Sequence, residues 1–307
     1  MKNRILPIAI AVFAVALFVT CKSSKTITIL HTNDTHSQIE PYITSKDTLG
    51  GVLRREQAIY DVRRQSKGPV FLFDAGDFSQ GTPYFNLFGG DVEIEMMNIM
   101  GYDAATLGNH EFDNGLDSLA AKLKKAKFPV VCANYKFPGC PELEKVIKDW
   151  IVIERQGVRI GIFGLSPNMD GLTFTSTVER MKYLDPVDVS KEMVKVLQEQ
   201  RCDLIVCLSH LGYDPEPGRP MCDPILASQV HGIDLIVSGH THIEKDTVVN
   251  GTHIIQTGVK GVNLGKVVIT KTKQKGNKLT RTQHVVITND KKEYNWIPSI
   301  QAGCPSF

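Results

Sequence analysis

Short runs of apolar and β-branched residues alternate with amphipathic segments along most of this 307-residue chain. Several of these runs are apolar enough for a strand that is buried on both faces, as in a parallel sheet. The alternation therefore predicts an α/β fold. The runs expected to form strands are residues 26–31, 70–74, 104–107, 130–132, 151–153, 159–163, 203–208, 235–238 and 254–256.

Two of the intervening segments have helical periodicity. In the first, Leu116, Leu119, Ala120 and Leu123 share one face, and Lys122, Lys124 and Lys125 lie off it. In the second, Val189, Met193 and Leu197 recur every four residues. Beyond Leu264 the pattern changes to two alternating strands, residues 266–272 and 280–288, joined by a turn at 274–277. This hairpin is expected to close the edge of the same domain.

The length allows either one large domain or two smaller ones. The chain is 42% hydrophobic, 7% aromatic and 22% charged, as in ordinary globular proteins. Because the strand pattern is continuous, we expect one catalytic domain at residues 26–290 and a tail at 291–307.

The first 20 residues have the pattern of a signal peptide. Lys2 and Arg4 precede an apolar stretch, residues 5–19, that is shorter than the roughly 20 residues of a spanning helix. The segment from Phe18 to Cys21 resembles a bacterial lipobox, although Phe18 and Thr20 depart from its usual residues. We therefore expect a lipidated N-terminus at Cys21, a linker at residues 21–25, and a periplasmic or surface lipoprotein of the bacterial cell envelope. Ordinary secretion is the alternative.

Charge and cysteine content argue against a nucleic-acid-binding protein and against a zinc site built from cysteines. Lys and Arg number 35 against 33 Asp and Glu, which offers no electrostatic footprint for a nucleic-acid polymer, so none is expected as a partner. Apart from Cys21, six cysteines remain and none forms a CxxC pair, which argues against a thiolate zinc site. Disulfides and buried free thiols both stay open.

Five of the predicted strands end at residues of the types that bind divalent metals. Because the carboxyl ends of strands in open α/β sheets meet at the ligand crevice, these distant residues should converge. The segments are Asn33-Asp34-Thr35-His36, Asp74-Ala75-Gly76-Asp77, Gly108-Asn109-His110-Glu111-Phe112-Asp113, Ser209-His210 and Ser238-Gly239-His240-Thr241-His242. Together they predict a metal site.

Each segment alone has a simpler interpretation, since Asp34 could cap a helix and Asp77 could hold a turn. Five of the nine histidines nevertheless lie in these segments. The other four, His31, His231, His253 and His284, are interpreted as structural or surface residues, with His31 a possible support for a ligand. Arg54 and Arg55 suggest a phosphate clamp, but a solvated helix face is the preferred interpretation.

The five motifs, in this order, resemble those of calcineurin-like dinuclear metallophosphoesterases. The Gly76 to Pro83 and Gly108 to Asp113 segments are similar to the bacterial 5′-nucleotidase branch, as is the stretch from Gln256 to Gly265. The resemblance covers about residues 26–290. It implies a four-layer α/β/β/α sandwich with the site above two packed sheets.

The resemblance also implies a ligand set for two ions. One ion would be held by Asp34, His36, Asp77 and His242, and the other by Asp77, Asn109, His210 and His240. Asp77 would bridge them, since an anionic carboxylate can shield two nearby dications. Nitrogen and oxygen ligands suit Zn, Mn, Fe or Co.

A hydroxide bridging two metals is available at neutral pH, because coordination lowers the pKa of water. His110 is not a ligand in the family pattern, so it would stabilise the transition state or protonate the leaving alkoxide. Asp113 could fix its tautomer, and a helix N-cap is the alternative role for Asp113.

These features predict an exported, metal-dependent phosphoesterase acting on nucleotides. Because 5′-nucleotidases usually carry a second domain that binds the nucleoside, we expect either a separately encoded partner domain or a broader range of phosphate esters. A non-catalytic lipoprotein that binds metal or nucleotide is a second hypothesis, and a TIM-barrel metal hydrolase acting on amides is a third.

Overall fold

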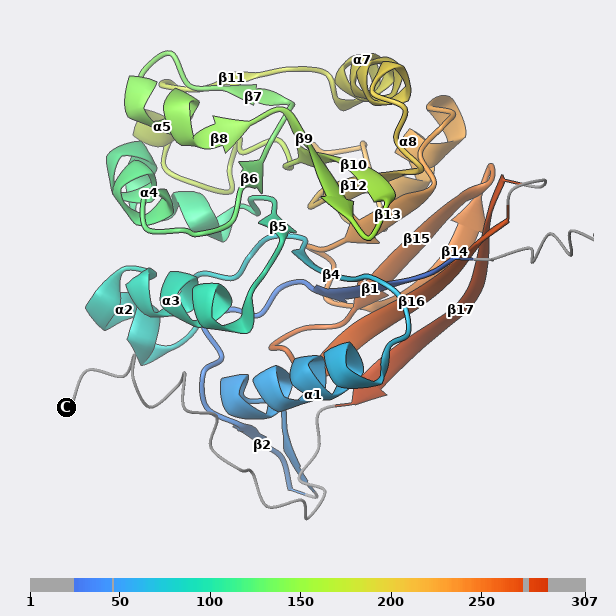
Figure 1. The fold of residues 1–307 in the computed structure, drawn as a ribbon. Coiled ribbons are helices and arrows are strands. Elements are labelled where there is room, and N and C mark those ends of the chain that lie inside the picture. Colours follow the sequence, from blue (N-terminus) through green and yellow to red (C-terminus); the bar gives the residue numbers. More distant parts are fainter. Residues whose placement is uncertain (1–24, 46, 273–275, 287–307) are drawn as a thin grey trace, which may run out of the picture.

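A computed structural model of the chain describes residues 25–45, 47–272 and 276–286. Two β-sheets pack against each other, and helices cover both outer faces (Figure 1). This is the four-layer α/β/β/α arrangement expected from the sequence. Several predicted segments lie outside the described residues: the signal peptide, Cys21, most of the linker, residues 274 and 275 of the predicted turn, and the tail at 291–307.

Each predicted strand run overlaps an observed strand. The strands of the first sheet are, in order across it, β17 (Gly276–Val286), β16 (Asn263–Thr272), β1 (Lys25–Thr32), β4 (Val70–Asp74), β5 (Ala104–Ala105), β6 (Val130–Val131) and β8 (Ile147–Lys148). β17 begins at Gly276, within the turn predicted at 274–277, and β8 was not predicted. The second sheet contains β14 (Glu244–Val249), β15 (Thr252–Thr257), β13 (Leu235–Ser238), β12 (Leu204–Ser209), β10 (Val158–Leu165) and β9 (Trp150–Arg155). Two short ribbons pair β2 (Tyr42–Ile43) with β3 (Thr48–Leu49) and β7 (Tyr135–Lys136) with β11 (Lys182–Tyr183).

The helices are divided between the two outer faces (Figure 1). The first sheet is covered by α1 (Val52–Gln65), α3 (Asp91–Met100) and α4 (Gly115–Leu123), and the second by α7 (Pro186–Glu199) and α8 (Asp223–Gln229). Shorter helices are α2 (Pro83–Phe88), η1 (His110–Phe112), α5 (Pro141–Val146) and α6 (Thr175–Val178). The helical periodicities found in the sequence correspond to α4 and α7.

The central strands run parallel, and the hairpin closes one edge. In the first sheet β1 pairs in parallel with β4, and β4 with β5, while β16 joins β1 antiparallel and β17 joins β16. In the second sheet β10, β12, β13 and β15 are parallel neighbours. The carboxyl ends of β1, β4 and β5 therefore share one edge of the first sheet, and those of β10, β12 and β13 share one edge of the second.

Side-chain alternation along the strands builds three hydrophobic layers. On β1, Ile27 and Ile29 lie in the layer between the sheets, whereas Leu30 packs under the helices of the first sheet. On β12, Val206 lies between the sheets and Ile205 packs against α7 and α8. The central strands are thus buried on two faces, which is why β4, β12 and β13 are continuous apolar runs rather than alternating ones.

The structure corrects several sequence interpretations. Arg55, expected on a solvated helix face, and Lys122, expected off the apolar face of its helix, are each 4% exposed. Lys122 donates from Nζ to Ser79 Oγ at 2.8 Å, and its ammonium group lies over the Phe78 and Phe85 rings, so its charge is held by polar and aromatic contacts rather than by water. Two open sheets replace the closed barrel of the TIM-barrel hypothesis, which is wrong.

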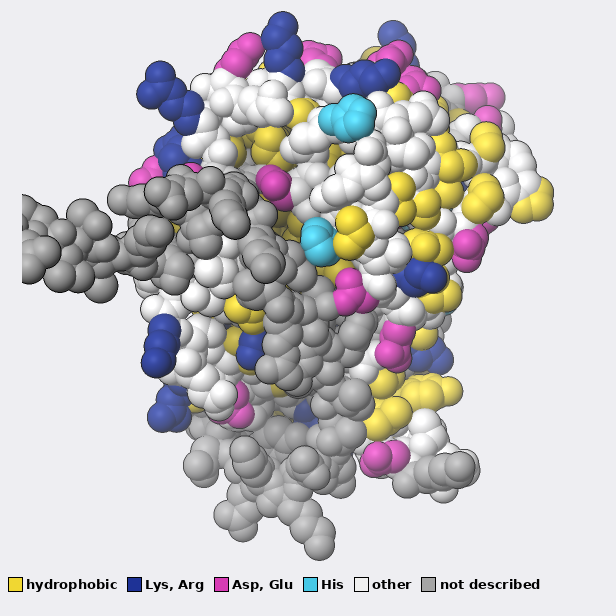
Figure 2. Space-filling view, turned by 90° about the vertical axis from the view of Figure 1, so that its right-hand side faces the viewer, with side chains coloured by type: hydrophobic (Ala, Val, Ile, Leu, Met, Phe, Trp, Pro, Cys, Tyr) yellow, Lys and Arg dark blue, Asp and Glu magenta, His cyan; other side chains and the backbone are white. Residues whose placement is uncertain are grey.

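The five cysteines within the described residues are free thiols. None of the helices described is long and apolar enough to span a bilayer. On the face seen in Figure 2, basic and acidic side chains are interspersed among the described residues, without a continuous patch of either sign.

Candidate metal centre

The loops that follow β1 and β4 are tied together by backbone hydrogen bonds. The N–H of Asp34 donates to Gly76 O at 2.9 Å, and that of His36 donates to Asp77 O at 3.0 Å. Several residues at this edge adopt positive φ angles without being glycine: Asp34, His36, Asp77, His240 and His242. Such conformations are uncommon outside glycine and collect at functional sites, and all five residues belong to the ligand set that the sequence predicted.

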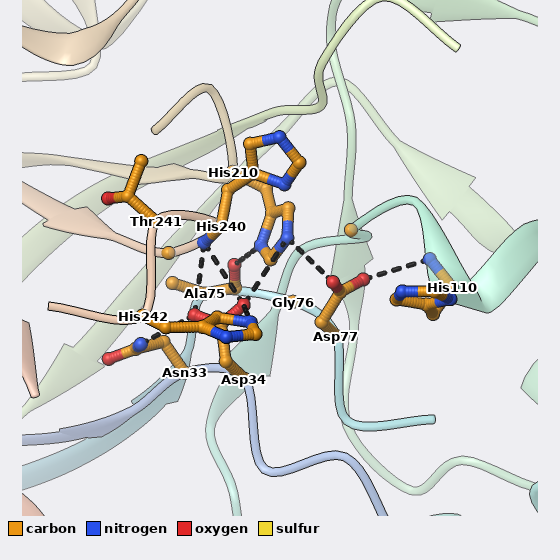
Figure 3. A network of polar contacts seen from close by, with 12 residues as sticks. Asn33, Asp34, Ala75, Gly76, Asp77, His110, His210, His240, Thr241 and His242 are labelled. Atoms are coloured by element: carbon orange, nitrogen blue, oxygen red, sulfur yellow. Dashed lines mark hydrogen bonds and ion pairs between the residues drawn. The ribbon is translucent and has the colours of Figure 1, made fainter. Parts of the chain in front are cut away.

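One cluster contains Asp34, His36 and His242, whose potential ligand atoms lie within 4.8 Å of one another. The Nε2 atoms of His36 and His242 are 2.9 Å apart. His242 Nε2 is 3.4 Å from Asp34 Oδ1, and both residues are labelled in Figure 3. The carboxylate of Asp34 is held from behind by Asn33 Nδ2 at 2.6 Å. Three donor groups from two distant loops thus converge on one point.

The second cluster contains Asp77, His210 and His240. His210 Nε2 lies 3.1 Å from Asp77 Oδ2, while His210 Nδ1 donates to the carbonyl of Ala75 at 2.6 Å (Figure 3). A ring with its far nitrogen bonded to a carbonyl has a fixed tautomer, as metal-binding histidines usually do. Asn109 is also buried, and its Oδ1 is without a hydrogen-bond partner in the described structure.

Asp77 belongs to two clusters, because it also groups with His36 and His110. Burial and nearby opposite charges shift the pKa values of His210 and Asp77 in opposite directions. Burial disfavours the charged imidazole of His210, but the Asp77 and Asp34 carboxylates outweigh it and raise the pKa of His210 to about 10. Burial also opposes ionisation of Asp77, yet His210 and the neighbouring histidines keep the pKa of Asp77 below its usual range. The site therefore holds ionised carboxylate in its interior.

Close packing leaves no room for a side chain at Gly108. A Cβ there would lie 2.1 Å from Asp77 Oδ1 and 2.7 Å from the Asp77 nitrogen. Gly239 is similarly packed against the ring of His210, since a Cβ would lie 2.6 Å from its Nδ1. Gly108 lets the loop after β5 approach the loop after β4, and Gly239 lets the loop after β13 approach the loop after β12.

The sequence interpretation gave Glu111 no role, although it organises the site. Its carboxylate is buried and accepts three backbone N–H groups: from Asp77 at 2.9 Å, from Ser79 at 2.9 Å and from Gly108 at 2.7 Å. Burial raises the pKa of Glu111, and the adjacent Asp77 raises it further. Only the pairing of loops far apart in sequence reveals this function.

His110 and Asp113 form a pair beside the clusters. His110 Nδ1 and Asp113 Oδ2 are 2.8 Å apart, which raises the pKa of His110. The His110 backbone N–H donates to Asp77 Oδ1 at 2.9 Å, and the His110 and His36 rings are 5.4 Å apart. His31, in contrast, packs against Gly265 of β16 and belongs to none of the ligand clusters found among the described residues.

The donor set fits divalent cations. Carboxylate and imidazole groups gather in the two clusters, and a third cluster that contains His36 and Asp77 links them. The buried Oδ1 of Asn109 has no hydrogen-bond donor among the described residues. Unsatisfied buried acceptors are costly unless an ion or water meets them.

Residues 27–244 match the family model described as calcineurin-like phosphoesterase. The chain belongs to this family. It is 32% identical over 278 residues to the trifunctional nucleotide phosphoesterase protein YfkN of Bacillus subtilis, covering 78% of this chain and 18% of that protein. It is 33% identical over 238 residues to the 5′-nucleotidase of Rattus norvegicus, covering 74% of this chain and 39% of the rat protein.

Solved structures agree with this membership. The 5′-nucleotidase precursor from Thermus thermophilus superposes with a TM-score of 0.79 and 32% identity, over 86% of this chain and 55% of that one. The structure of YfkN from Bacillus subtilis has a TM-score of 0.73 over 91% of this chain and 96% of that one, at 24% identity, and so shows the shared fold. This calcineurin-like phosphoesterase spans little over half the length of the Thermus protein and a smaller share of each of the two sequence relatives.

Proposed function

We propose that this protein is a metal-dependent phosphoesterase that hydrolyses nucleotide phosphate esters at a dinuclear centre. The observation that carries the proposal is that a third cluster, His36, Asp77 and His110, joins the two ligand clusters through His36 and Asp77, and Asp113 is bonded to His110. A purely structural metal site would have no use for a half-exposed, hydrogen-bonded histidine at its edge.

The residues of the two clusters would divide the work of holding the ions. Asp34, His36 and His242 would hold one ion, and Asn109, His210 and His240 the other, with Asp77 between them. When bound, two such metal ions supply a nucleophile at neutral pH and neutralise the charge on phosphate oxygens. The protein's contribution is to keep the ligands fixed, through the carbonyl of Ala75 behind His210 and the amide of Asn33 behind Asp34.

His110 would deliver a proton to the leaving alkoxide. Asp113 accepts the Nδ1–H of His110, which leaves Nε2 of the protonated ring as the donor. The same contact favours the protonated form, because the hydrogen bond to Asp113 raises the pKa of His110. The N-cap of α4 is Asn114 rather than Asp113, so the contact of Asp113 with His110 supports the positioning role.

Nucleotides are the proposed substrates because the relatives named above are nucleotide phosphoesterases or 5′-nucleotidases. We further propose export and lipidation at Cys21, on the basis of the signal-like N-terminus. A separately encoded nucleotide-binding domain, or activity on a broader set of phosphate esters, remains part of this proposal.

The test combines metal analysis with phosphate release. Asp77→Asn should lose bound metal. His110→Ala should keep metal and lose about 10²- to 10⁴-fold in turnover on an ester with a poor leaving group. His231→Ala, at an exposed histidine that contacts Asn250, is the matched control and should change neither quantity. Full activity of His110→Ala on AMP would refute the proton-donor role.

Substrate choice is tested with AMP, UDP-glucose, 2′,3′-cyclic AMP and an aryl phosphate. A clear preference for the nucleotides would support the proposal. Equal, weak rates on all four would refute nucleotide specificity while leaving a broad phosphoesterase, and binding without turnover would favour the non-catalytic lipoprotein.

A further inference from the structure

The loop between β12 and α8 contains a tight turn that lies against the candidate metal centre. Glu216 and Arg219 exchange backbone hydrogen bonds, at 3.1 Å from the Glu216 nitrogen and 2.9 Å from the Arg219 nitrogen. Pro217 and Gly218 occupy the two central positions, and Gly218 has a φ of 77°. Proline followed by a glycine at positive φ is the residue pair that a type II turn requires. The backbone of Glu216 is therefore well defined.

The side chain of Glu216 is held as firmly as its backbone. Its Oε2 lies 3.1 Å from Arg219 Nε, and Arg219 Nη1 donates to the carbonyl of Asp170 at 2.9 Å. The other oxygen, Oε1, lies 3.3 Å from Nε2 of His240. The side chains of Glu216 and Arg219 are only 34% and 23% exposed, so water competes weakly for these contacts.

His240 needs such an acceptor if it is to bind a cation. Figure 3 shows one ring nitrogen of His240 turned toward His210, and the rings are 5.2 Å apart. A neutral imidazole that offers this nitrogen to a metal carries its proton on the other nitrogen, Nε2. In His210, the ring nitrogen that faces away from Asp77 donates its proton to the carbonyl of Ala75. For His240, the facing group is the Glu216 carboxylate at 3.3 Å, and Nε2 of His240 has no aligned hydrogen-bond partner in the described structure, so this carboxylate is the acceptor within reach when the ring turns to bind.

Packing alone leaves His240 room to move. Its ring lines a cavity of about 210 Å³ that is also bounded by Leu211, Met221 and Arg219. On its other side the ring faces Gly212, which has no side chain to restrain it. A polar contact on Nε2 is thus the feature that would set the ring orientation.

We propose that Glu216 is a positioning residue for the second metal ion: it accepts the Nε2–H of His240 and so directs the other ring nitrogen at the cation. This inference rests on the proposed dinuclear centre. Outer contacts of this kind typically contribute 10- to 100-fold to metal affinity. The loss should fall on the ion held by Asp77, Asn109, His210 and His240, because the polar contacts described for Glu216 include no residue of the other cluster.

The experiment measures zinc binding rather than turnover. Metal-free protein is equilibrated at Zn²⁺ concentrations set by a chelator buffer, and bound zinc is counted by mass spectrometry. Glu216→Ala should bind the second Zn²⁺ about 10- to 100-fold more weakly and the first one normally. Glu216→Gln, which retains an acceptor oxygen, should be close to wild type. Glu154→Ala is the control, because it removes a comparable Glu–Arg ion pair, with Arg159, far from the site.

Three results with Glu216→Ala would overturn the inference. Glu216→Ala could bind both ions with wild-type affinity, or it could lose both in step. It could also show a lower thermal midpoint without metal that accounts for the weaker binding, which would make Glu216 structural. A wild-type protein that binds fewer than two ions would refute the dinuclear centre itself and the inference with it, whereas failure to hydrolyse AMP would leave this inference intact.

Discussion

Replacing Glu111 by glutamine tests whether one buried carboxylate joins the loops of the candidate site. Its Oε2 accepts the N–H groups of Asp77 and Gly108, and its Oε1 accepts that of Ser79. Glutamine can keep the first two bonds with its oxygen, but its amide then presents N–H to the N–H of Ser79. The substitution leaves one buried donor unsatisfied while the side-chain volume stays the same.

The expected cost follows from that count. A buried donor left without a partner costs about 1–3 kcal/mol, so Glu111→Gln should destabilise the metal-free protein by about that amount. Glu111→Ala would strand three donors and cost about 3–9 kcal/mol on the same basis, which approaches the whole stability of many domains. Glutamine is therefore the informative variant.

Urea unfolding of the metal-free protein provides the measurement, with Glu93→Gln as the control. Glu93 is 4% exposed, and neither of its carboxylate oxygens has a hydrogen-bond partner within the described structure. Like Glu111, Glu93 lies near the buried ammonium group of Lys122, but Glu93→Gln leaves no backbone N–H without a partner, so it measures the cost of the lost charge alone. If both variants changed the free energy of unfolding equally, Glu111 would be an ordinary buried acid and the reasoning would fail.

Two further predictions concern the same edge of the sheets. Burial raises the pKa of Asp74 to about 7, so its neutral form stabilises the fold below about pH 4, and this contribution is lost by about 1.4 kcal/mol per pH unit as pH rises toward 7. Asp74→Asn, whose amide oxygen can still accept the hydrogen bond from the Thr32 hydroxyl, should remove this slope in thermal unfolding followed from pH 5 to 8, and an unchanged slope would refute it. Gly108→Ala should displace Asp77 and weaken zinc binding at least tenfold, since the added Cβ would lie 2.1 Å from its carboxylate. Gly251→Ala, whose Cβ meets nothing within 4 Å, should leave zinc binding unchanged, and equal losses in both variants would contradict the packing argument.

The central strands of the two sheets could be predicted from the sequence because a strand buried on both faces is a continuous run of apolar residues. Runs such as β4 and β12 are apolar throughout, whatever packs on them. The edge strand β14 was not predicted, because its residues alternate between exposed and half-buried and include three charged side chains. Edge strands carry little hydrophobic signal, and their pairing depends on a neighbour elsewhere in the chain.

Errors about buried charges have a different origin. The periodicity of α1 and α4 identifies the face toward the sheet but not what covers the opposite side. Arg55 is covered by the loop at Gly261, where a Cβ would lie 2.4 Å from its guanidinium, and Lys122 is covered by the residues around Ser79. These contacts join segments more than 40 residues apart, so a local pattern cannot contain them.

The convergence of the five motifs was predictable from the rule that strand ends meet, whereas the residues that support them were not. Asn33 bonds to Thr257 across 224 residues, and Glu111 bonds to Asp77 across 34. A single sequence shows which residues could bind a metal. It does not show which neutral or acidic neighbours hold them, because those roles exist only after the loops have met.

The backbone of the site suggests that the loops are shaped before any cation arrives. A left-handed conformation costs a non-glycine residue about 1–3 kcal/mol unless its surroundings enforce it, although Asp and His tolerate it better than most. Asp34 and His36 are held in it by backbone bonds to Gly76 and Asp77, and Asp34 O also accepts the N–H of Lys260 at 2.7 Å. Because these bonds lie within the protein, they persist without metal. The same residue types that donate to the cation thus also make the sharp turns, which is why Asp and His, rather than Glu, fill these positions.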